Sequence, residues 1–414
     1  MLRRTPPTLQ GHKSLRTADR HRPRAACFGS AAARVGGAVA APLSEEFAPL
    51  DRAWLNTAHQ GPMPLVAAAA AREAIEAKLD PRRMSDEAFF QVPAALRSSL
   101  GELVGAGGDE IVLGNSTTYG LNLLAHGLPL RDGDEVLLVE GDFPATIYPW
   151  LPLQRRGVRL RTVPAPSGAL EPEDLDEALT DRTRVVCTSW VFSLSGHAAE
   201  VTALVDVCRQ REDVTFVLNG SQAVGARPAD VYDLGVDALV SCGYKWLCGP
   251  YATGFAWLHP ALMRRLDQEQ GYWLAQVDEI ANPPGRYGLR QDLGAAAYDV
   301  FCTANLSVFP AWHRAVSVLL DHGIDQIERQ DQALIDQLIA GLPDGWTLRS
   351  PETGSRRSTL VFLEPEPPDT VARALRRLDV AGVDAAERAG RLRLSPHVHN
   401  TPADIERALA ALAA

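Results

Sequence analysis

Short apolar runs alternate with longer amphipathic stretches through the middle of the chain. The runs lie at 110–113, 135–139, 158–163, 184–188, 214–218, 238–240 and 254–258. Stretches with the apolar spacing of a helix, such as 171–180 and 200–210, separate several of them. This alternation is typical of an α/β fold with a largely parallel sheet.

The two ends of the chain have other patterns. The Ala-rich stretch 65–79 predicts a helix that Asp80-Pro81 ends, and a second helix is expected at about 93–104. From about residue 311 a long helical stretch, 312–340, precedes an α+β tail with elements expected at 358–363, 369–378, 382–385, 391–394 and 402–413. We divide the chain into a basic extension (1–40), a segment packing with the small domain (41–70), a large domain (71–310) and a small C-terminal domain (311–414).

Charge is unevenly distributed. The 414 residues include 41 Lys and Arg against 51 Asp and Glu, a net charge of −10. Residues 1–40 hold eight of the basic residues and one acid, so this segment carries +7 and the rest carries −17. An acidic body argues against a nucleic-acid partner.

The basic head is rich in Pro, Gly, Ala and Ser without periodicity, which predicts disorder. Two interpretations of it stay open. Ala38-Val39-Ala40 resembles the cleavage site of a targeting peptide, although Arg34 interrupts the apolar run before it. The other interpretation is a non-native or over-extended N-terminus.

Cysteine usage and hydropathy indicate the setting. The six cysteines (27, 187, 208, 242, 248 and 302) form no CxxC motif, and no His pair has ligand spacing. We therefore expect reduced thiols, no metal site and a cytoplasmic protein. No run approaches the ~20 apolar residues that span a bilayer, so no membrane partner is expected.

A lysine stands between two predicted strands in the segment SCGYKWLCGP at 241–250. Held in a turn beside Tyr244 and Trp246, Lys245 would be desolvated, with a lowered pKa and a nucleophilic amine. The alternative is a lysine that snorkels from a strand end to solvent. The rest of the chain has to decide between the two.

Three other predicted strands end in polar residues that packing does not require. They are followed by the segments LGNSTTYG (113–120), EGDFP (140–144) and LNGSQAVG (218–225). Ligands of open α/β sheets collect at the carboxyl ends of strands, where helix N-termini bind anions. The Ser/Thr run of the first segment suits a phosphate, although the same residues are ordinary helix caps.

The order and spacing of these segments resemble the pyridoxal-phosphate (PLP) enzymes of the class V aminotransferase family, which includes aminotransferases, cysteine desulfurases, C–S lyases and isopenicillin N epimerase-like proteins. The resemblance runs from LNTAHQGPMP at 55–64 through RLSPHVHNTPADI at 393–405 to the end of the sequence. It implies an α/β, PLP-dependent transferase-like (fold type I) large domain with a mainly parallel seven-stranded sheet, plus a smaller α+β C-terminal domain. The implied cofactor is pyridoxal 5'-phosphate.

The resemblance also implies roles for the matching residues. Lys245 would form the Schiff base, and Arg393 would bind the substrate carboxylate through its planar guanidinium. Thr303 matches a segment that reaches the phosphate of the neighbouring subunit, which implies a homodimer with shared sites. The implied cofactor-binding residues are Thr117, Thr118, Ser241 and Tyr244 at the phosphate, Phe143 on the ring face, Ser193 and Gln222 near the phenolic oxygen, and Asn219 at the ring nitrogen.

Each residue also has a plain structural explanation. Phe143 could belong to the core, Arg393 could be a charge on an exposed strand, and Thr117 and Thr118 could be caps. Their family order around Lys245 favours the functional interpretation and a nucleophilic lysine. Four further aromatic residues suggest either an aromatic pocket wall or core packing: Tyr148, Trp150, Trp190 and Phe192.

Asn219 departs from the family, which has an aspartate about 26 residues before the lysine. In relatives that aspartate pairs with the protonated ring nitrogen, and the protonated ring serves as the electron sink for the substrate carbanion. A neutral amide can hydrogen-bond this nitrogen but cannot balance its charge. Transamination depends heavily on the sink, whereas expulsion of a β-substituent depends on it less. We therefore expect β-elimination or C–S cleavage to be favoured.

A second departure is a missing thiol. Desulfurases need a nucleophilic cysteine shortly before the substrate arginine, but no cysteine follows Cys302, and SRRS at 355–358 fills the approximate region.

We expect a lyase or aminotransferase that acts on an α-amino acid through an external aldimine. The alternatives are an amino-acid epimerase and a non-catalytic protein that keeps the fold. A yellow purified protein whose spectrum responds to amino acids would favour an enzyme.

Overall fold

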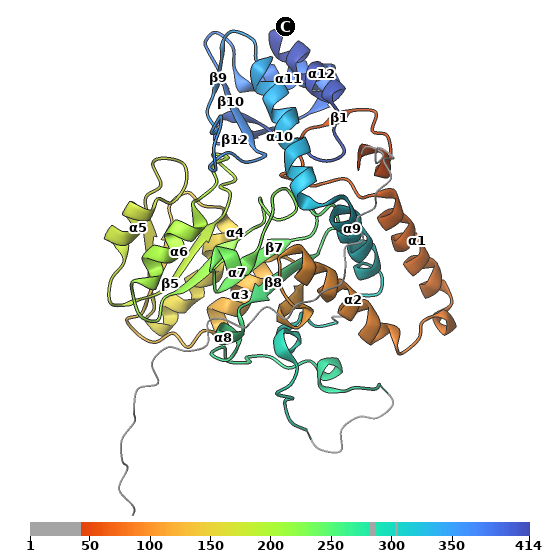
Figure 1. Cartoon of the computed structure of the whole chain (residues 1–414), viewed down its shortest axis with the longest axis vertical. Helices are drawn as coiled ribbons and strands as arrows, with labels where there is room; N and C mark the ends of the chain where they lie inside the picture. Colours follow the sequence, from red (N-terminus) through yellow and green to blue (C-terminus); the bar gives the residue numbers. More distant parts are fainter. Residues whose placement is uncertain (1–42, 281–286, 303–304) are drawn as a thin grey trace, which may run out of the picture. The chain divides into compact units, whose positions relative to one another are not determined.

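The computed structural model describes residues 43–280, 287–302 and 305–414 (Figure 1). Thr303 lies outside the described residues. Among the described helices, none has both the length and the apolar character needed to cross a membrane.

A seven-stranded sheet forms the centre of the large domain, with the strand order β2-β8-β7-β6-β5-β3-β4. Strand β8 is antiparallel to its two neighbours, and the other pairs are parallel. The predicted α/β class and mainly parallel sheet are therefore confirmed. The strands are β2 (Ile111–Gly114), β3 (Glu135–Val139), β4 (Arg159–Val163), β5 (Thr183–Ser189), β6 (Thr215–Asn219), β7 (Ala238–Cys242) and β8 (Gly254–Leu258).

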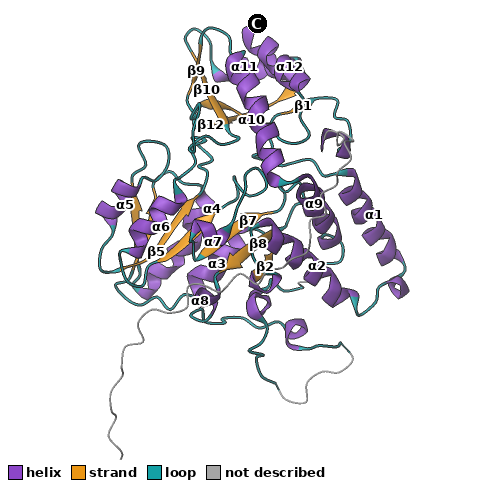
Figure 2. Ribbon diagram, viewed as in Figure 1, coloured by secondary structure: helices purple, strands orange, loops and turns teal. Residues whose placement is uncertain are grey.

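Both faces of the sheet are covered, which explains why its inner strands are continuous apolar runs. Alternate residues of one strand enter different clusters: Leu137 and Val139 pack on one face, Val136 and Leu138 on the other. Helices flank the orange strands in Figure 2. These helices are α3 (Thr117–Gly127), α4 (Pro144–Ile147), α5 (Pro172–Ala178), α6 (Val201–Arg209), α7 (Val231–Leu234) and α8 (Pro260–Met263).

Helix prediction was accurate for α1 (Leu65–Leu79) and less so elsewhere. Helix α2 (Ala88–Leu103) begins five residues before the predicted start and contains Pro93. The stretch predicted as one helix is two, α9 (Phe309–His322) and α10 (Ile324–Ala340). Gly323 separates them with a φ of 88°, a conformation that glycine adopts readily and that ends a helix.

The smaller C-terminal sheet is antiparallel, in the order β12-β13-β10-β9. Helices α10, α11 (Val371–Val380) and α12 (Pro402–Ala413) lie beside it (Figure 1). Near the N-terminus, β1 (Ala53–Trp54) pairs in parallel with β11 (Val383–Asp384), so the segment before α1 is bound to this C-terminal unit. The four strands are β9 (Trp346–Leu348), β10 (Val361–Pro365), β12 (Ala386–Arg388) and β13 (Arg391–Leu394).

Candidate active site

A cavity lies where β5, β6 and β7 end and α3 begins. Eight of the predicted site residues line it: Thr117, Thr118, Phe143, Ser193, Asn219, Gln222, Tyr244 and Lys245. Five residues that were not predicted complete the wall: Ser116, Ala145, Ser189, Val191 and Ser221. The structure thus brings together segments that are up to about 130 residues apart in the sequence.

Lys245 lies in a tight turn between β7 and β8. Gly249 N donates to the Gly243 carbonyl at 2.7 Å, and Gly243 N donates to the Thr253 carbonyl at 3.0 Å, which closes the turn. A β-carbon on Gly243 would overlap Thr253 and Trp312, so only glycine fits there. The crowding of glycines that singled out this segment therefore has a packing cause.

The Lys245 ammonium is in an unfavourable environment. Burial lowers its pKa; Cys242 opposes this shift, and the positive charges of Arg393 and Arg388 add to it. The Nζ atom lies 5.6 Å from the centre of the Phe143 ring. A lysine with a depressed pKa inside a cavity is a candidate nucleophile, and it does not snorkel to solvent.

The N-terminus of α3 supplies the hydroxyl-rich end of the cavity. Ser116 caps the helix, its Oγ accepting from Tyr119 N at 3.2 Å, and Thr117 and Thr118 follow at the first two helical positions. Gly254 of β8 allows this close approach, because a β-carbon there would overlap the Ser116 backbone. Backbone N–H groups and hydroxyls at a helix N-terminus suit a phosphate.

Asn219 and Gln222 form the floor of the cavity, and both amides are held. The Trp246 indole donates to Gln222 Oε1 at 2.9 Å, and Gln222 Nε2 donates to the Ala58 carbonyl at 3.1 Å. Asn219 is buried and bonded to Thr146 and Ser221. The floor is therefore rigid and uncharged at its surface.

Arg393 of β13 lies beside the cavity, where it contacts the lining residue Ser193, but it is not itself one of the lining residues. It is only 2% exposed, which rules out an exposed strand charge. Its guanidinium donates to the Ser193 carbonyl at 3.5 Å and to Asn56 Oδ1 at 3.2 Å, while its Nε has no partner among the described residues. Burial and the nearby Arg388 lower its pKa to about 10. The guanidinium thus has capacity for an anionic ligand.

Other predictions can now be placed. Phe143 is 44% exposed, so it is not a core residue. Trp150, Trp190 and Phe192 are buried in the apolar clusters and do not line the cavity, and Tyr148 is exposed, so the aromatic wall is not formed by these residues. Ser241 is buried on β7, its Oγ has no partner within the described ranges, and it is not part of the cavity wall.

Sequence reasoning missed two groups near the cavity. Asp142, next to Phe143, is buried and accepts a hydrogen bond from Ser189 of β5. Because β5 is distant in sequence, this contact could not be predicted from the pattern around Asp142. Partial desolvation lowers the pKa of His59, and the nearby positive charges of Arg388, Arg393 and Lys245 lower it further. Asp142 stood in a strand-end segment that was already marked as polar.

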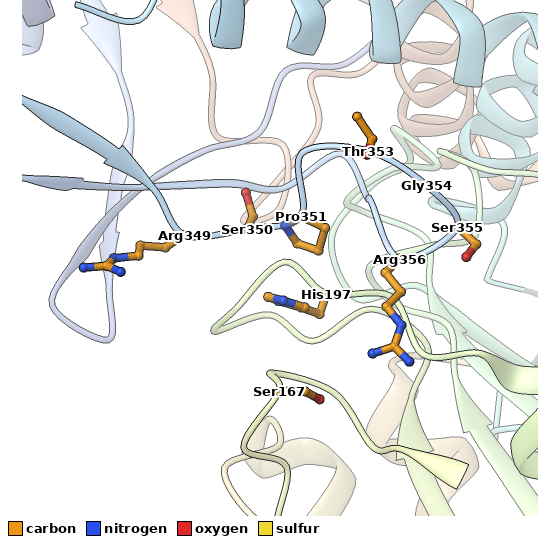
Figure 3. A pocket seen from close by; sticks show the side chains of 9 residues that line it. All are labelled: Ser167, His197, Arg349, Ser350, Pro351, Thr353, Gly354, Ser355 and Arg356. Carbon is orange, nitrogen blue, oxygen red and sulfur yellow. The ribbon is translucent and has the colours of Figure 1, made fainter. Parts of the chain in front are cut away.

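A second, larger cavity of about 380 Å³ lies between the loops around Ser167 and His197 and the loop 349–356 (Figure 3). Its arginines are neutralised: Arg356 pairs with Glu171, and Arg349 pairs with Glu364. Ser355 donates to Glu200. Among the described lining residues, no arginine is therefore left free for an anion, in contrast to the cavity at Lys245.

Comparison with known proteins identifies the family. Residues 82–407 match the family described as Aminotransferase class-V. The chain belongs to the class V aminotransferase family. This membership confirms the resemblance read from the sequence and makes the chain a PLP-dependent enzyme.

Individual relatives differ in their reactions. Isopenicillin N epimerase of Streptomyces clavuligerus is 28% identical over 86% of this chain and 93% of its own length. A probable cysteine desulfurase of Xylella fastidiosa (strain 9a5c) is 29% identical over 77% of this chain and 79% of its own. A solved complex of the cystine C–S lyase C-DES with its product cysteine persulfide shares the fold, with a TM-score of 0.79, 21% identity, and coverage of 88% of this chain and 97% of that chain.

The donor set of the cavity fits this cofactor. Hydroxyls and helix N–H groups suit a phosphate, Phe143 offers a ring face, and Lys245 offers an amine of lowered pKa. Ser193 Oγ is buried without a partner among the described residues, as expected for a group that a ligand completes.

Proposed function

We propose that this chain is a PLP-dependent lyase that removes a β-substituent, such as a sulfur group, from an α-amino acid. The observation that carries the proposal is the neutral floor: Asn219, buried and bonded to Thr146 and Ser221, stands where the family has an aspartate. When bound, the cofactor supplies an aldehyde for the substrate amine and a ring that accepts electrons from the α-carbon. A floor without charge favours reactions in which a leaving group takes those electrons.

Different residues of the chain would bind the cofactor, bind the substrate and carry the proton. Lys245 would hold the cofactor and, once released, carry the α-proton, which its lowered pKa favours. Arg393 would orient the substrate through its carboxylate, and Phe143 would cover the ring face. Thr117, Thr118 and Tyr244 would hold the phosphate, and Ser241 would lie behind these phosphate-binding residues. Ser193 and Gln222 would lie near the ring. Thr303 would act across a subunit boundary.

A substrate panel tests the proposal. Amino acids with a β-leaving group and their analogues without one are incubated with the enzyme, and pyruvate, ammonia, thiol and keto acids are measured. We expect pyruvate and ammonia in equal amounts from the first set only, and none from Lys245→Ala. Keto acid without ammonia would instead establish transamination.

An epimerase is the second candidate, because isopenicillin N epimerase aligns over 93% of its own length. It would return the α-proton to the opposite face. In D2O an epimerase gives α-deuterated substrate with loss of optical activity and no ammonia, which separates it from the lyase.

We further propose a cytoplasmic homodimer with shared sites. Apolar side chains stand exposed along α1: Leu65, Val66, Ile75 and Leu79. Tyr251, also exposed, packs on Tyr244 at the cavity with ring centres 4.7 Å apart. A second copy of the chain would cover these surfaces. Light scattering is expected to give twice the chain mass.

A further inference from the structure

The side-chain amide of Asn219 has a fixed orientation. Ser221 N donates to its Oδ1 at 3.1 Å, and Ser221 Oγ donates to the same atom at 2.6 Å. A backbone N–H can only donate, so the atom that faces it must be the amide oxygen. The amide nitrogen therefore faces Thr146, and Nδ2 donates to Thr146 Oγ1 at 2.9 Å.

Beyond Thr146 the hydrogen bonds lead to the buried carboxylate of Asp142. Ser189 Oγ donates to Asp142 Oδ1 at 2.6 Å, Phe143 N to the same oxygen at 2.6 Å, and Ser189 N to Oδ2 at 2.9 Å. Because a backbone N–H donates to each oxygen, an amide in place of this carboxylate would turn its NH2 group toward at least one backbone donor. Burial raises the pKa of Asp142 to about 6, which leaves it ionised at pH 7.5.

The Asp142 carboxylate sets the proton direction at Ser189 and Thr146, and the Asn219 amide oxygen sets it at Ser221 and Thr117. The Ser189 hydroxyl proton goes to Asp142, so Ser189 accepts from Thr146 Oγ1 at 3.4 Å, and Thr146 in turn accepts from Asn219. On the other side, the Ser221 proton goes to Asn219, so Thr117 Oγ1 donates to Ser221 at 2.6 Å. One ordered chain runs from the start of α3 under the cavity to Asp142.

This order determines what Asn219 offers to a ligand. Both lone pairs of Oδ1 and one hydrogen of Nδ2 are used. The second hydrogen of Nδ2 has no acceptor in the part of the chain that the structure describes, and Asn219 lines the cavity. The remaining polar group is therefore an N–H donor, which needs an acceptor.

We propose that the bonds from Ser221, supported by Thr146, make Asn219 a donor to the cavity, so that the ring nitrogen of the bound cofactor is held unprotonated. The proposal rests on the proposed function and adds the protonation state of the ring. The charges around the cavity agree with it. Lys245, Arg393 and Arg388 disfavour another positive charge, and His59, Cys242 and Tyr244 are the other titratable groups around them. Asp142 is separated from the cavity by the Ser189 hydroxyl.

Solid-state ¹⁵N NMR of the holoenzyme with PLP labelled at the ring nitrogen tests the proposal. We expect the resonance of an unprotonated pyridine between pH 6.5 and 9. The Asn219→Asp variant, which presents a carboxylate, is expected to give the protonated resonance and so shows that the probe responds. A protonated resonance in the wild type would overturn the inference while leaving the proposed function intact. A protein that does not bind PLP would instead refute the proposed function.

A second variant tests the anchoring. Thr146→Val is isosteric and breaks the chain without changing charge. We expect PLP affinity to fall about five- to tenfold, the effect of one lost hydrogen bond, with the ring nitrogen still unprotonated because Ser221 N holds the amide oxygen. Ser167→Ala, which removes a hydroxyl at the other cavity, serves as the control. An unchanged affinity in Thr146→Val would refute a positioning role for the chain.

Discussion

A β-carbon placed on Gly61 would overlap the carbonyl oxygen of Lys245. The two backbones touch because Gly61 N donates to the Tyr244 carbonyl at 3.0 Å, directly before the lysine. The segment before α1 therefore fixes the position of the lysine turn, and only glycine allows this approach.

Gly61→Ala is expected to push the lysine turn away from α3. Overpacking of this kind costs about 1–3 kcal/mol, so we expect PLP affinity to fall about tenfold or more and the melting temperature to drop. Fluorescence titration with PLP measures the affinity. Gly288→Ala is the control, since none of the described atoms lies within 4 Å of the added carbon. Wild-type affinity in Gly61→Ala would show that the turn can move freely.

Covalent attachment at Lys245 can be checked cleanly because the sequence contains only three lysines: Lys13, Lys78 and Lys245. After borohydride reduction of the holoenzyme, mass spectrometry is expected to find the cofactor on the peptide with Lys245. In Lys245→Ala the adduct should disappear, whereas Lys78→Ala should keep it. An adduct on another lysine would contradict the assignment.

Arg393→Lys tests carboxylate recognition. A lysine keeps the charge but loses the planar pair of donors, which is worth about 1.5–3 kcal/mol for a charged hydrogen bond. We expect KM for the best amino acid of the panel to rise at least about tenfold, with a smaller change in kcat. Arg391→Lys, whose guanidinium lies near Glu364 on the surface, should change KM less than about twofold. Equal effects in both variants would refute the role of Arg393.

The buried pair of His397 and Asp331 makes stability depend on pH. Nδ1 of His397 lies 2.7 Å from Asp331 Oδ2, and Nε2 lies 3.0 Å from the Trp246 carbonyl. Burial opposes the imidazolium charge, but the Asp331 carboxylate outweighs it and raises the pKa of His397 to about 10. Because the unfolded value is about 6.5, this contribution is complete below pH ~6.5 and is lost as the pH rises through 10.

His397→Gln should therefore lower stability by about 3–5 kcal/mol at pH 6.5, since it leaves a buried carboxylate unpaired, and the loss should shrink toward pH 10. Denaturant unfolding at pH 6.5, 8 and 9.5 measures both effects. Arg349→Gln, which breaks an exposed pair, should change stability by less than about 1 kcal/mol at any of these values. A pH-independent loss in His397→Gln would contradict the charged pair.

The sequence predicted the elements whose causes are local. The Ala-rich helix 65–79 and the strand 135–139 have the predicted bounds, because propensity and an unbroken apolar run determine them. The split at Gly323 was missed, because an isolated glycine is tolerated inside many helices. The break shows only in the packing, since α9 contacts α1 and α2 whereas α10 contacts α12.

The same division holds for the site. Lys245, Phe143 and Arg393 stand in motifs of fixed order, so the sequence was sufficient to propose them. The link between Asp142 and Asn219 passes through Thr146 and Ser189 on separate elements. Such a link depends on how strands are ordered in the sheet, and no spacing along one sequence encodes it.

The pairing of β1 with β11 affects how short an active form of this enzyme can be. Asn56 contacts Arg393, the Ala58 carbonyl holds Gln222, and Ala58 N donates to Ser395 Oγ. A variant trimmed to begin at α1 would keep every residue of the central sheet and the lysine itself. It would nevertheless lose the segment that joins the floor of the cavity to Arg393, so any shortened form has to retain the chain from Ala53 onward.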